Sequence, residues 1–298
     1  MTSFVVTRRD FLRCSSLALA GWGLPRVAAG HPQGGFRFGM VTDPHYADCD
    51  ARGTRFYGES VAKMRECVEL MRRERVEFLI ELGDFKDQDE PSVEANTMRY
   101  LVEIEAEFQR FGGPTYHVLG NHDMDSLSKS QFLAAIDNTG IDAEASYYSF
   151  DHGGLHFVVL DANFMADGAP YDHDNFDYRD TNIPPAQLDW LAQDLGATDA
   201  PTLLFVHQRL DGEGSAFINN ADEVRMLLRR RGNVVAAFHG HDHAGGHNLI
   251  DGVHYYTLRA VVEGSGPESS SYAIVEVTGA GLAVTGYRRA VTQELPGT

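Results

Sequence analysis

The sequence is poor in cysteine, because its 298 residues include only Cys14, Cys49 and Cys67. A structural zinc site built from thiolates is therefore not expected, and oxygen and imidazole groups are the available metal ligands. Cys14 lies in the N-terminal segment discussed below, and cleavage of that segment would leave only Cys49 and Cys67. They could pair in an oxidising compartment, but a disulfide needs a geometry that sequence does not reveal, so both states stay open.

A long apolar run is also missing from the N-terminus. The weakly apolar stretch at residues 15–24 has about half of the roughly 20 residues that a membrane-spanning helix needs, so no stable membrane anchor is expected. Arg8 and Arg9 precede this stretch, and Ala28 and Ala29 offer small residues for cleavage. Residues 1–29 thus resemble a bacterial twin-arginine export signal. The resemblance implies contact with the twin-arginine translocase and a periplasmic or secreted protein; the alternative is an amphipathic N-terminal segment.

Basic residues are scarce, with 25 Lys and Arg against 43 Asp and Glu. Residues 1–29 carry four arginines and one aspartate, so residues 30–298 keep 21 basic and 42 acidic side chains, a net charge of −21. Such a charge disfavours binding to polyanions, and no nucleic-acid partner is expected. If the substrate is itself anionic, the site must supply positive charge, and metal ions would do so.

No Pro/Gly/Ser-rich linker, low-complexity run or internal repeat divides residues 30–298, which we expect to form one large domain. Short apolar runs that end in polar residues recur along it. These runs predict strands at residues 36–41, 78–82, 116–119, 203–206 and 234–238. Each strand is followed closely by aspartate, asparagine or histidine, so five strand ends carry the candidate chemistry.

Helical periodicity fills most of the intervals between these strands, at residues 60–75, 95–111, 185–195 and 222–231. Residues 147–160 predict a hairpin, and further strands at 253–258, 272–277 and 282–287 indicate a second, more antiparallel sheet. The alternation predicts an α/β fold with two mixed β-sheets packed as a sandwich and flanked by helices, in four layers. Ligands would then lie beyond the carboxyl ends of the strands.

The polar groups after the strands form five motifs. They are Asp43-Pro44-His45, Gly83-Asp84, Gly120-Asn121-His122-Asp123, His207, and Gly240-His241-Asp242-His243. A glycine before a ligand lets the backbone turn tightly and approach an ion closely. Carboxylate, amide and imidazole ligands suit Mn, Fe, Zn or Co. One ion takes about four to six donors, so this set, which offers more, indicates two ions.

The five motifs, in this order, resemble those of the calcineurin-like metallophosphoesterase superfamily. The resemblance implies that Asp43, His45 and His243 hold one divalent ion. It places Asn121, His207 and His241 at the other, with Asp84 bridging the two. A shared carboxylate and a shared hydroxide reduce the repulsion between two cations about 4 Å apart. The hydroxide would attack phosphorus, so no protein nucleophile is needed.

Three residues outside the ligand set are further candidates. The resemblance implies that His122 contacts the phosphoryl group and assists the leaving oxygen as a general acid or transition-state donor. Asp123 could fix the tautomer of His122, or be a solvated turn carboxylate. Arg55 could bind a second phosphate through both guanidinium nitrogens, or be an ordinary surface arginine. We expect His239 at a strand end or in support of a ligand, and His247 in a loop. Residues 172–180 are expected to form a solvated acidic loop; the alternatives are a substrate lid and a calcium loop.

Two details of the sequence narrow the choice of subfamily. Residues 83–87 lack the tyrosine that purple acid phosphatases carry three residues after the bridging aspartate, so a purple enzyme is disfavoured. Residues 38–43, 53–57 and 185–191 are similar to the manganese-dependent ADP-ribose/CDP-alcohol diphosphatase branch. We therefore expect an exported bimetallic hydrolase of phosphodiester or pyrophosphate bonds in a small molecule, with manganese favoured. The alternatives are a periplasmic phosphomonoesterase and a metal- or phosphate-binding protein that has lost turnover.

Overall fold

The computed structural model describes residues 35–173 and 176–297. The twin-arginine signal predicted at residues 1–29 lies outside this part of the chain. The residues described belong to one compact unit. Across the residues described, no helix combines the length and the apolar character that crossing a bilayer requires.

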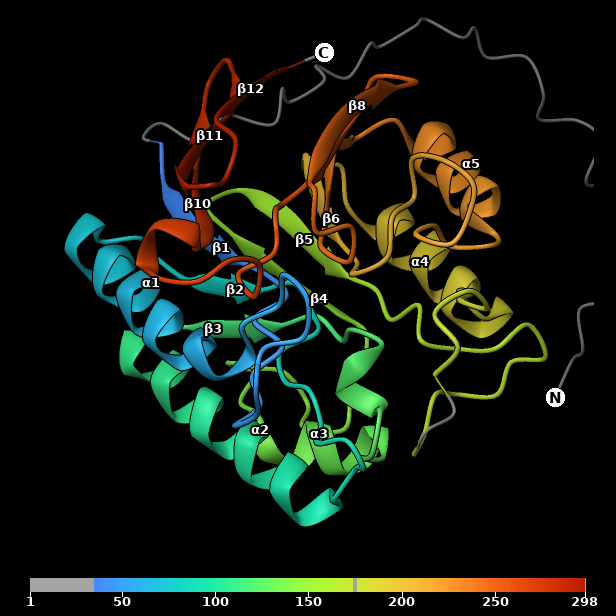
Figure 1. Cartoon of the computed structure of the whole chain (residues 1–298). Helices are drawn as coiled ribbons and strands as arrows, with labels where there is room; N and C mark the ends of the chain where they lie inside the picture. Colours follow the sequence, from blue (N-terminus) through green and yellow to red (C-terminus); the bar gives the residue numbers. More distant parts are fainter. Residues whose placement is uncertain (1–34, 174–175, 298) are drawn as a thin grey trace, which may run out of the picture. The chain divides into compact units, whose positions relative to one another are not determined.

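The first sheet is mixed and has six strands (Figure 1). In sheet order they are β12 (Gln293–Pro296), β11 (Gly281–Arg288), β10 (Ser271–Thr278), β1 (Arg37–Val41), β2 (Leu79–Glu81) and β3 (Thr115–His117). The strands β1, β2 and β3 run parallel to one another. The pairs β1–β10, β10–β11 and β11–β12 are antiparallel. The parallel strands are buried almost throughout, as strands covered on both faces are expected to be.

The second sheet also has six strands. In sheet order they are β4 (Tyr148–His152), β5 (Leu155–Val159), β6 (Thr202–Phe205), β7 (Val234–His239), β9 (Val253–Thr257) and β8 (Gly246–Ile250). The four central strands are parallel, and both edge strands are antiparallel to their neighbours.

Helices cover the outer faces of the two sheets (Figure 1). The α-helices are α1 (Ser60–Glu74), α2 (Glu94–Phe108), α3 (Lys129–Ala135), α4 (Pro185–Ala197) and α5 (Ala221–Arg231), and the 3₁₀ turns are η2 (Tyr57–Glu59), η3 (Gln109–Phe111), η4 (His122–Met124) and η5 (Pro267–Ser269). Residues of α1–α3 pack in one core cluster with the first sheet, and residues of α4 and α5 pack in another with the second. In α1, Met64, Cys67, Val68 and Met71 recur at helical spacing and are buried, as one face of an amphipathic helix should be.

A layer of aromatic side chains joins the two sheets. Phe38 of β1 stacks on Phe78 with ring centroids 4.9 Å apart, and the edge of Phe157 in β5 meets Phe38 at 5.8 Å. Phe205 and Phe238 stack at 5.3 Å in the facing sheet. These residues belong to one buried cluster between the sheets, so the predicted four-layer α/β/β/α sandwich is confirmed.

Three details of the sequence prediction are corrected. The strands β9, β10 and β11 do not form a separate antiparallel sheet, because β10 and β11 extend the first sheet beside β1 while β9 pairs parallel with β7. His247 lies in β8 rather than in a loop, and α3 and β12 were not predicted. Cys49 and Cys67 are both free thiols, so the pairing left open by the sequence is absent here.

Candidate active site

The seven predicted metal ligands come from loops that follow parallel strands of both sheets. The first sheet supplies four: Asp43 and His45 after β1, Asp84 after β2, and Asn121 after β3. The second supplies His207 after β6, and His241 and His243 after β7. The face-to-face packing of the sheets therefore builds a single site from positions about two hundred residues apart.

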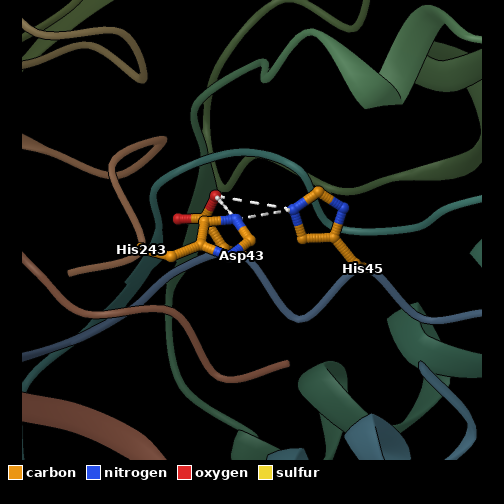
Figure 2. Close-up of side chains that lie close together, drawn as sticks. All are labelled: Asp43, His45 and His243. Atoms are coloured by element: carbon orange, nitrogen blue, oxygen red, sulfur yellow. Dashed lines mark hydrogen bonds and ion pairs between the residues drawn. The ribbon is translucent and has the colours of Figure 1, made fainter. Parts of the chain in front are cut away.

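One group of ligand atoms consists of Asp43, His45 and His243 (Figure 2). Asp43 Oδ1 lies 3.4 Å from His243 Nε2 and 3.6 Å from His45 Nε2. The two Nε2 atoms are 3.2 Å apart. Figure 2 shows these three atoms pointing toward one another, as ligands around a common cation do.

A second group consists of Asp84, His207 and His241. Asp84 Oδ2 lies 3.1 Å from His207 Nε2, and His241 Nδ1 is 3.3 Å from the same nitrogen. Asp84 Oδ2 is also 3.4 Å from His45 Nε2, so one carboxylate oxygen faces both groups. Among the residues described, Asn121 Oδ1 is buried without a hydrogen-bond partner.

In three of the predicted ligand histidines, a hydrogen bond on one side of the ring determines which nitrogen faces the other ligand atoms. The Nδ1 atoms of His45, His207 and His243 lie 3.1 Å from Asp87 Oδ2, 2.7 Å from the Leu82 carbonyl and 2.6 Å from Glu263 Oε1, respectively. An Nδ1–H that donates to an oxygen leaves the Nε2 lone pair free, which is the usual arrangement of a metal-binding histidine.

Unusual backbone conformations are concentrated at the same place. Asp43, His45, Asp84 and His241 have φ angles of 50°, 44°, 55° and 64°, a region that non-glycine residues rarely adopt. Gly120 is needed because a Cβ at that position would collide with the backbone nitrogen and Oδ1 of Asp84. Such strain persists only where the surrounding structure holds it, and it clusters at functional sites.

The electrostatic environment favours bound positive charge. Burial alone lowers the pKa of His45, but the carboxylates of Asp84, Asp43 and Asp87 outweigh it and raise the pKa to about 10. Burial and the charge of His207 lower the pKa of His241 to about 4. Because the carboxylates around His45 favour its protonated form despite burial, the same field would stabilise a metal cation there. The unpaired Asn121 oxygen and the donor set together fit two divalent ions.

His122 lies beside the ligands with a quarter of its side chain exposed toward the pocket. Its Nδ1 is 3.4 Å from Asp87 Oδ2, and its ring centroid is 4.7 Å from that of His45. Burial lowers the pKa of His122, against the opposing charges of Asp87 and Asp84.

Asp123 does not occupy the expected position beside the His122 ring. Its carboxylate is fully buried and accepts hydrogen bonds from the backbone N–H groups of Asp84, Phe85 and Gly120. Successive side chains of the η4 turn point in different directions, so Asp123 supports the backbone of Asp84. The carboxylate that faces His122 is Asp87, three residues after Asp84, where purple acid phosphatases carry tyrosine.

A pocket of about 690 Å³ opens over the ligands. Asn121, His122, His241 and His243 line its floor, and Arg55 is the only lysine or arginine among the described residues that line it. Arg55 Nε lies 3.9 Å from Glu263 Oε1. Tyr178 also lines the pocket, so the acidic loop that we expected to be merely solvated contributes to it.

Sequence reasoning missed Asp87, Glu263 and Tyr178. For Asp87 a signal was present: it lies three residues after Asp84, at the position where purple acid phosphatases carry a metal-binding tyrosine. Glu263 and Tyr178 lie in no strand-end motif. The signal for Tyr178 was the acidic stretch at residues 172–180, for which a substrate lid was the alternative to a solvated loop.

Buried carboxylate, amide and imidazole groups that converge at the strand ends of an α/β/β/α sandwich define a two-metal hydrolytic site. Comparison with known proteins agrees: residues 36–245 match the model of the family described as calcineurin-like phosphoesterase. The chain belongs to this family, and it is a metal-dependent phosphoesterase.

Individual relatives cover most of the chain. A protein of Oryza sativa, named manganese-dependent ADP-ribose/CDP-alcohol diphosphatase, is 30% identical, and the match covers 81% of this chain and 88% of the relative. A protein of the same name from Arabidopsis thaliana is 27% identical over 85% of this chain and 94% of the relative. The crystal structure of a dimetal phosphatase from Danio rerio matches the fold with a TM-score of 0.76 and 23% identity, over 88% of this chain and 99% of that one.

Proposed function

We propose that the protein is an exported, manganese-dependent hydrolase that cleaves pyrophosphate or phosphodiester bonds in nucleotide-type small molecules. The observation that carries the proposal is the convergence of two ligand groups on the shared carboxylate of Asp84, beneath a pocket large enough for a small molecule. The names of the rice and Arabidopsis relatives, which match most of this chain, support the substrate class and the metal.

In this proposal, Asp43, His45 and His243 would hold one ion, and Asn121, His207 and His241 would hold the other. Asp84 would be a ligand of both. When bound, two divalent cations would activate water and stabilise charge on the phosphoryl oxygens. His45, His207 and His243 are held in the required tautomer by a carboxylate or carbonyl on the far side of the ring. The ligand geometry is therefore prepared before an ion arrives.

His122 acts on the leaving group. Its Nδ1 faces Asp87, so Nε2 is the nitrogen available to donate a proton or a hydrogen bond to the leaving oxygen. Asp87 orients the ring and stabilises its protonated form. Arg55 lies on the wall of the same pocket and would bind a second phosphate, such as the one that leaves a pyrophosphate.

The activity test uses purified protein loaded with Mn²⁺, with bound metal measured in parallel. ADP-ribose, CDP-choline, bis-p-nitrophenyl phosphate and p-nitrophenyl phosphate are the substrates. We expect turnover of the diphosphates or the diester to exceed that of the monoester. Absence of turnover with all four, with metal bound, would disprove the proposal. Preference for the monoester would favour the alternative, a periplasmic phosphomonoesterase.

Export is proposed from the arginine pair and the short apolar stretch at residues 1–29. In a bacterial host with a twin-arginine translocase, the native chain should accumulate in the periplasm. An Arg8→Lys/Arg9→Lys variant should stay in the cytoplasm, because the translocase reads the arginine pair. Equal distribution of the two forms would contradict export by this route.

A further inference from the structure

The loop after β2 contacts His122 at three separate points. Asp84 Oδ1 accepts a hydrogen bond from the His122 backbone N–H at 2.7 Å. Lys86 Nζ donates to the His122 backbone carbonyl at 2.6 Å. Asp87 Oδ2 lies 3.4 Å from Nδ1 of the His122 ring. Three residues of this loop thus contact the N–H, the carbonyl and the ring of one histidine.

Lys86 is the unexpected member of this set. Its side chain is fully buried, and besides the His122 carbonyl it contacts Asp125, whose side chain is also fully buried. Asp125 in turn accepts a hydrogen bond from the Ser126 backbone N–H. The buried pair therefore joins the loop after β2 to the first residue of the η4 turn and to the residues that follow the turn.

Stability alone gives little reason for this pair. Removing two charges from water costs several kcal/mol for each ion, and hydrophobic replacement of a buried pair is often neutral or stabilising. The His122 ring packs against His45 and Phe176, with ring centroids 4.7 Å and 5.5 Å away, but its buried Nδ1 makes no hydrogen bond of normal geometry among the described residues. Its direction depends on how firmly its own backbone is held.

We propose that Lys86, neutralised by Asp125, is a positioning residue that fixes the backbone of His122 and so aims its ring at the leaving group. The inference rests on the proposed function of His122 as the group that assists the leaving oxygen. Neither Lys86 nor Asp125 contacts the substrate in this proposal. Their effect passes through His122, whose ring nitrogen and the Asp125 carboxylate lie within 4.8 Å of one another.

The test replaces both charges at once, as Lys86→Met/Asp125→Asn, because removing one partner would leave an uncompensated buried charge. We expect the variant to bind two metal ions per chain and to unfold close to the wild-type temperature. Its kcat should fall about 10- to 100-fold with little change in KM, since a positioning contact is lost while binding groups remain. A crystal structure should show the His122 ring displaced from Asp87.

A matched control is available at Lys129 and Asp161. Lys129 Nζ lies 2.5 Å from the buried carboxylate of Asp161 and 3.3 Å from the Asn163 carbonyl, so it also joins a carboxylate to a backbone carbonyl. This pair contacts neither His122 nor a predicted ligand. Lys129→Met/Asp161→Asn should therefore leave kcat within about twofold of wild type, since distant sites act independently.

Combination with His122→Ala separates positioning from a general structural effect. If Lys86 acts only through His122, adding the double substitution to His122→Ala should cause no further loss of kcat. An equal loss in both backgrounds would overturn the inference, as would wild-type kcat in the double variant. If Lys86→Met/Asp125→Asn fails to fold, Lys86→Gln/Asp125→Asn keeps polar groups at both positions. Its shorter amide does not reach the carbonyl, and the same loss is expected.

The proposed function and this inference can fail separately. If the wild-type protein turned over none of the substrates, the proposed function would fail. The crystal structure of the double variant would still decide whether Lys86 holds the ring: an unmoved His122 would overturn the inference, and a displaced ring would support it.

Discussion

At the scale of single residues, His122 differs from the seven predicted ligands in its surroundings. The ligand side chains converge on the two metal positions, whereas the His122 ring faces Asp87 on one side and the pocket on the other. Its role can therefore be removed without removing a ligand.

We expect His122→Ala to lower kcat by about 10²- to 10⁴-fold, the usual contribution of a general acid, while both metal ions stay bound. Kinetics on the diester, together with metal analysis, measure the two effects separately. Asp123→Asn is not a neutral comparison, because that carboxylate supports the Asp84 backbone. Unchanged kcat in His122→Ala would remove the assigned role.

Much of the site was predictable at the residue scale. Strand-end polar groups, with a glycine directly before Asp84, Asn121 and His241, identified the seven candidate ligands, because short motifs keep their local geometry wherever the chain places them. Asp123 shows the limit of this reasoning. Sequence adjacency to His122 predicted a contact, but the direction of the side chain in the η4 turn sends it to three backbone N–H groups instead.

At the scale of elements, His156 connects three parts of the second sheet and its helix layer. Its Nδ1 lies 2.7 Å from Asp151 of β4, and its Nε2 lies 2.8 Å from Asp194 of α4. The hydrogen bond with Asp194, reinforced by Asp151, raises the pKa of His156 above its usual value.

A raised pKa makes this contact dependent on pH. Protonated His156 stabilises the fold fully below its unfolded pKa of about 6.5, and the contribution disappears as pH rises through the higher folded pKa. Near pH 6, His156→Gln should cost about 1 kcal/mol, or about 2 °C in melting temperature. The difference from wild type should shrink toward about pH 9, well above the unfolded value. Thermal unfolding of both proteins across this range measures it, and a constant difference would contradict the assignment.

The positions of strands and helices along the chain were predicted better than the pairing of the strands. The period and length of the apolar runs identified most strands and helices, because burial of one face or of both leaves a local pattern. Sheet membership leaves none: β10 and β11 looked like members of a second sheet, yet they extend the first beside β1. The partner of a strand depends on which sheet edge is unpaired when the strand packs, and this is a property of the folded protein.

At the scale of the whole molecule, the metal positions connect the two sheets. Asp43, His45, Asp84 and Asn121 follow strands of the first sheet, whereas His207, His241 and His243 follow strands of the second. Bound ions should therefore stabilise the packing of one sheet on the other.

Removal of metal should lower the melting temperature, and added Mn²⁺ should restore it. At a metal concentration of 100 times Kd, binding adds about 2.7 kcal/mol, which corresponds to roughly 5–10 °C in a domain of this size. Calorimetry after chelation measures the shift. In Asp84→Ala, the melting temperature should no longer respond to Mn²⁺, because both sites lose a ligand; two ions bound per variant chain would contradict the bridge.

The sequence by itself determined the donor types, their order along the chain and the strand-and-helix pattern, because each of these is local. The tertiary structure alone decided which side chains support them: Asp87 rather than Asp123 faces His122, Glu263 and Leu82 orient ligand histidines, and Lys86 reaches the His122 carbonyl. The physical reason is that these contacts join segments distant in sequence, and their geometry exists only after the two sheets have packed.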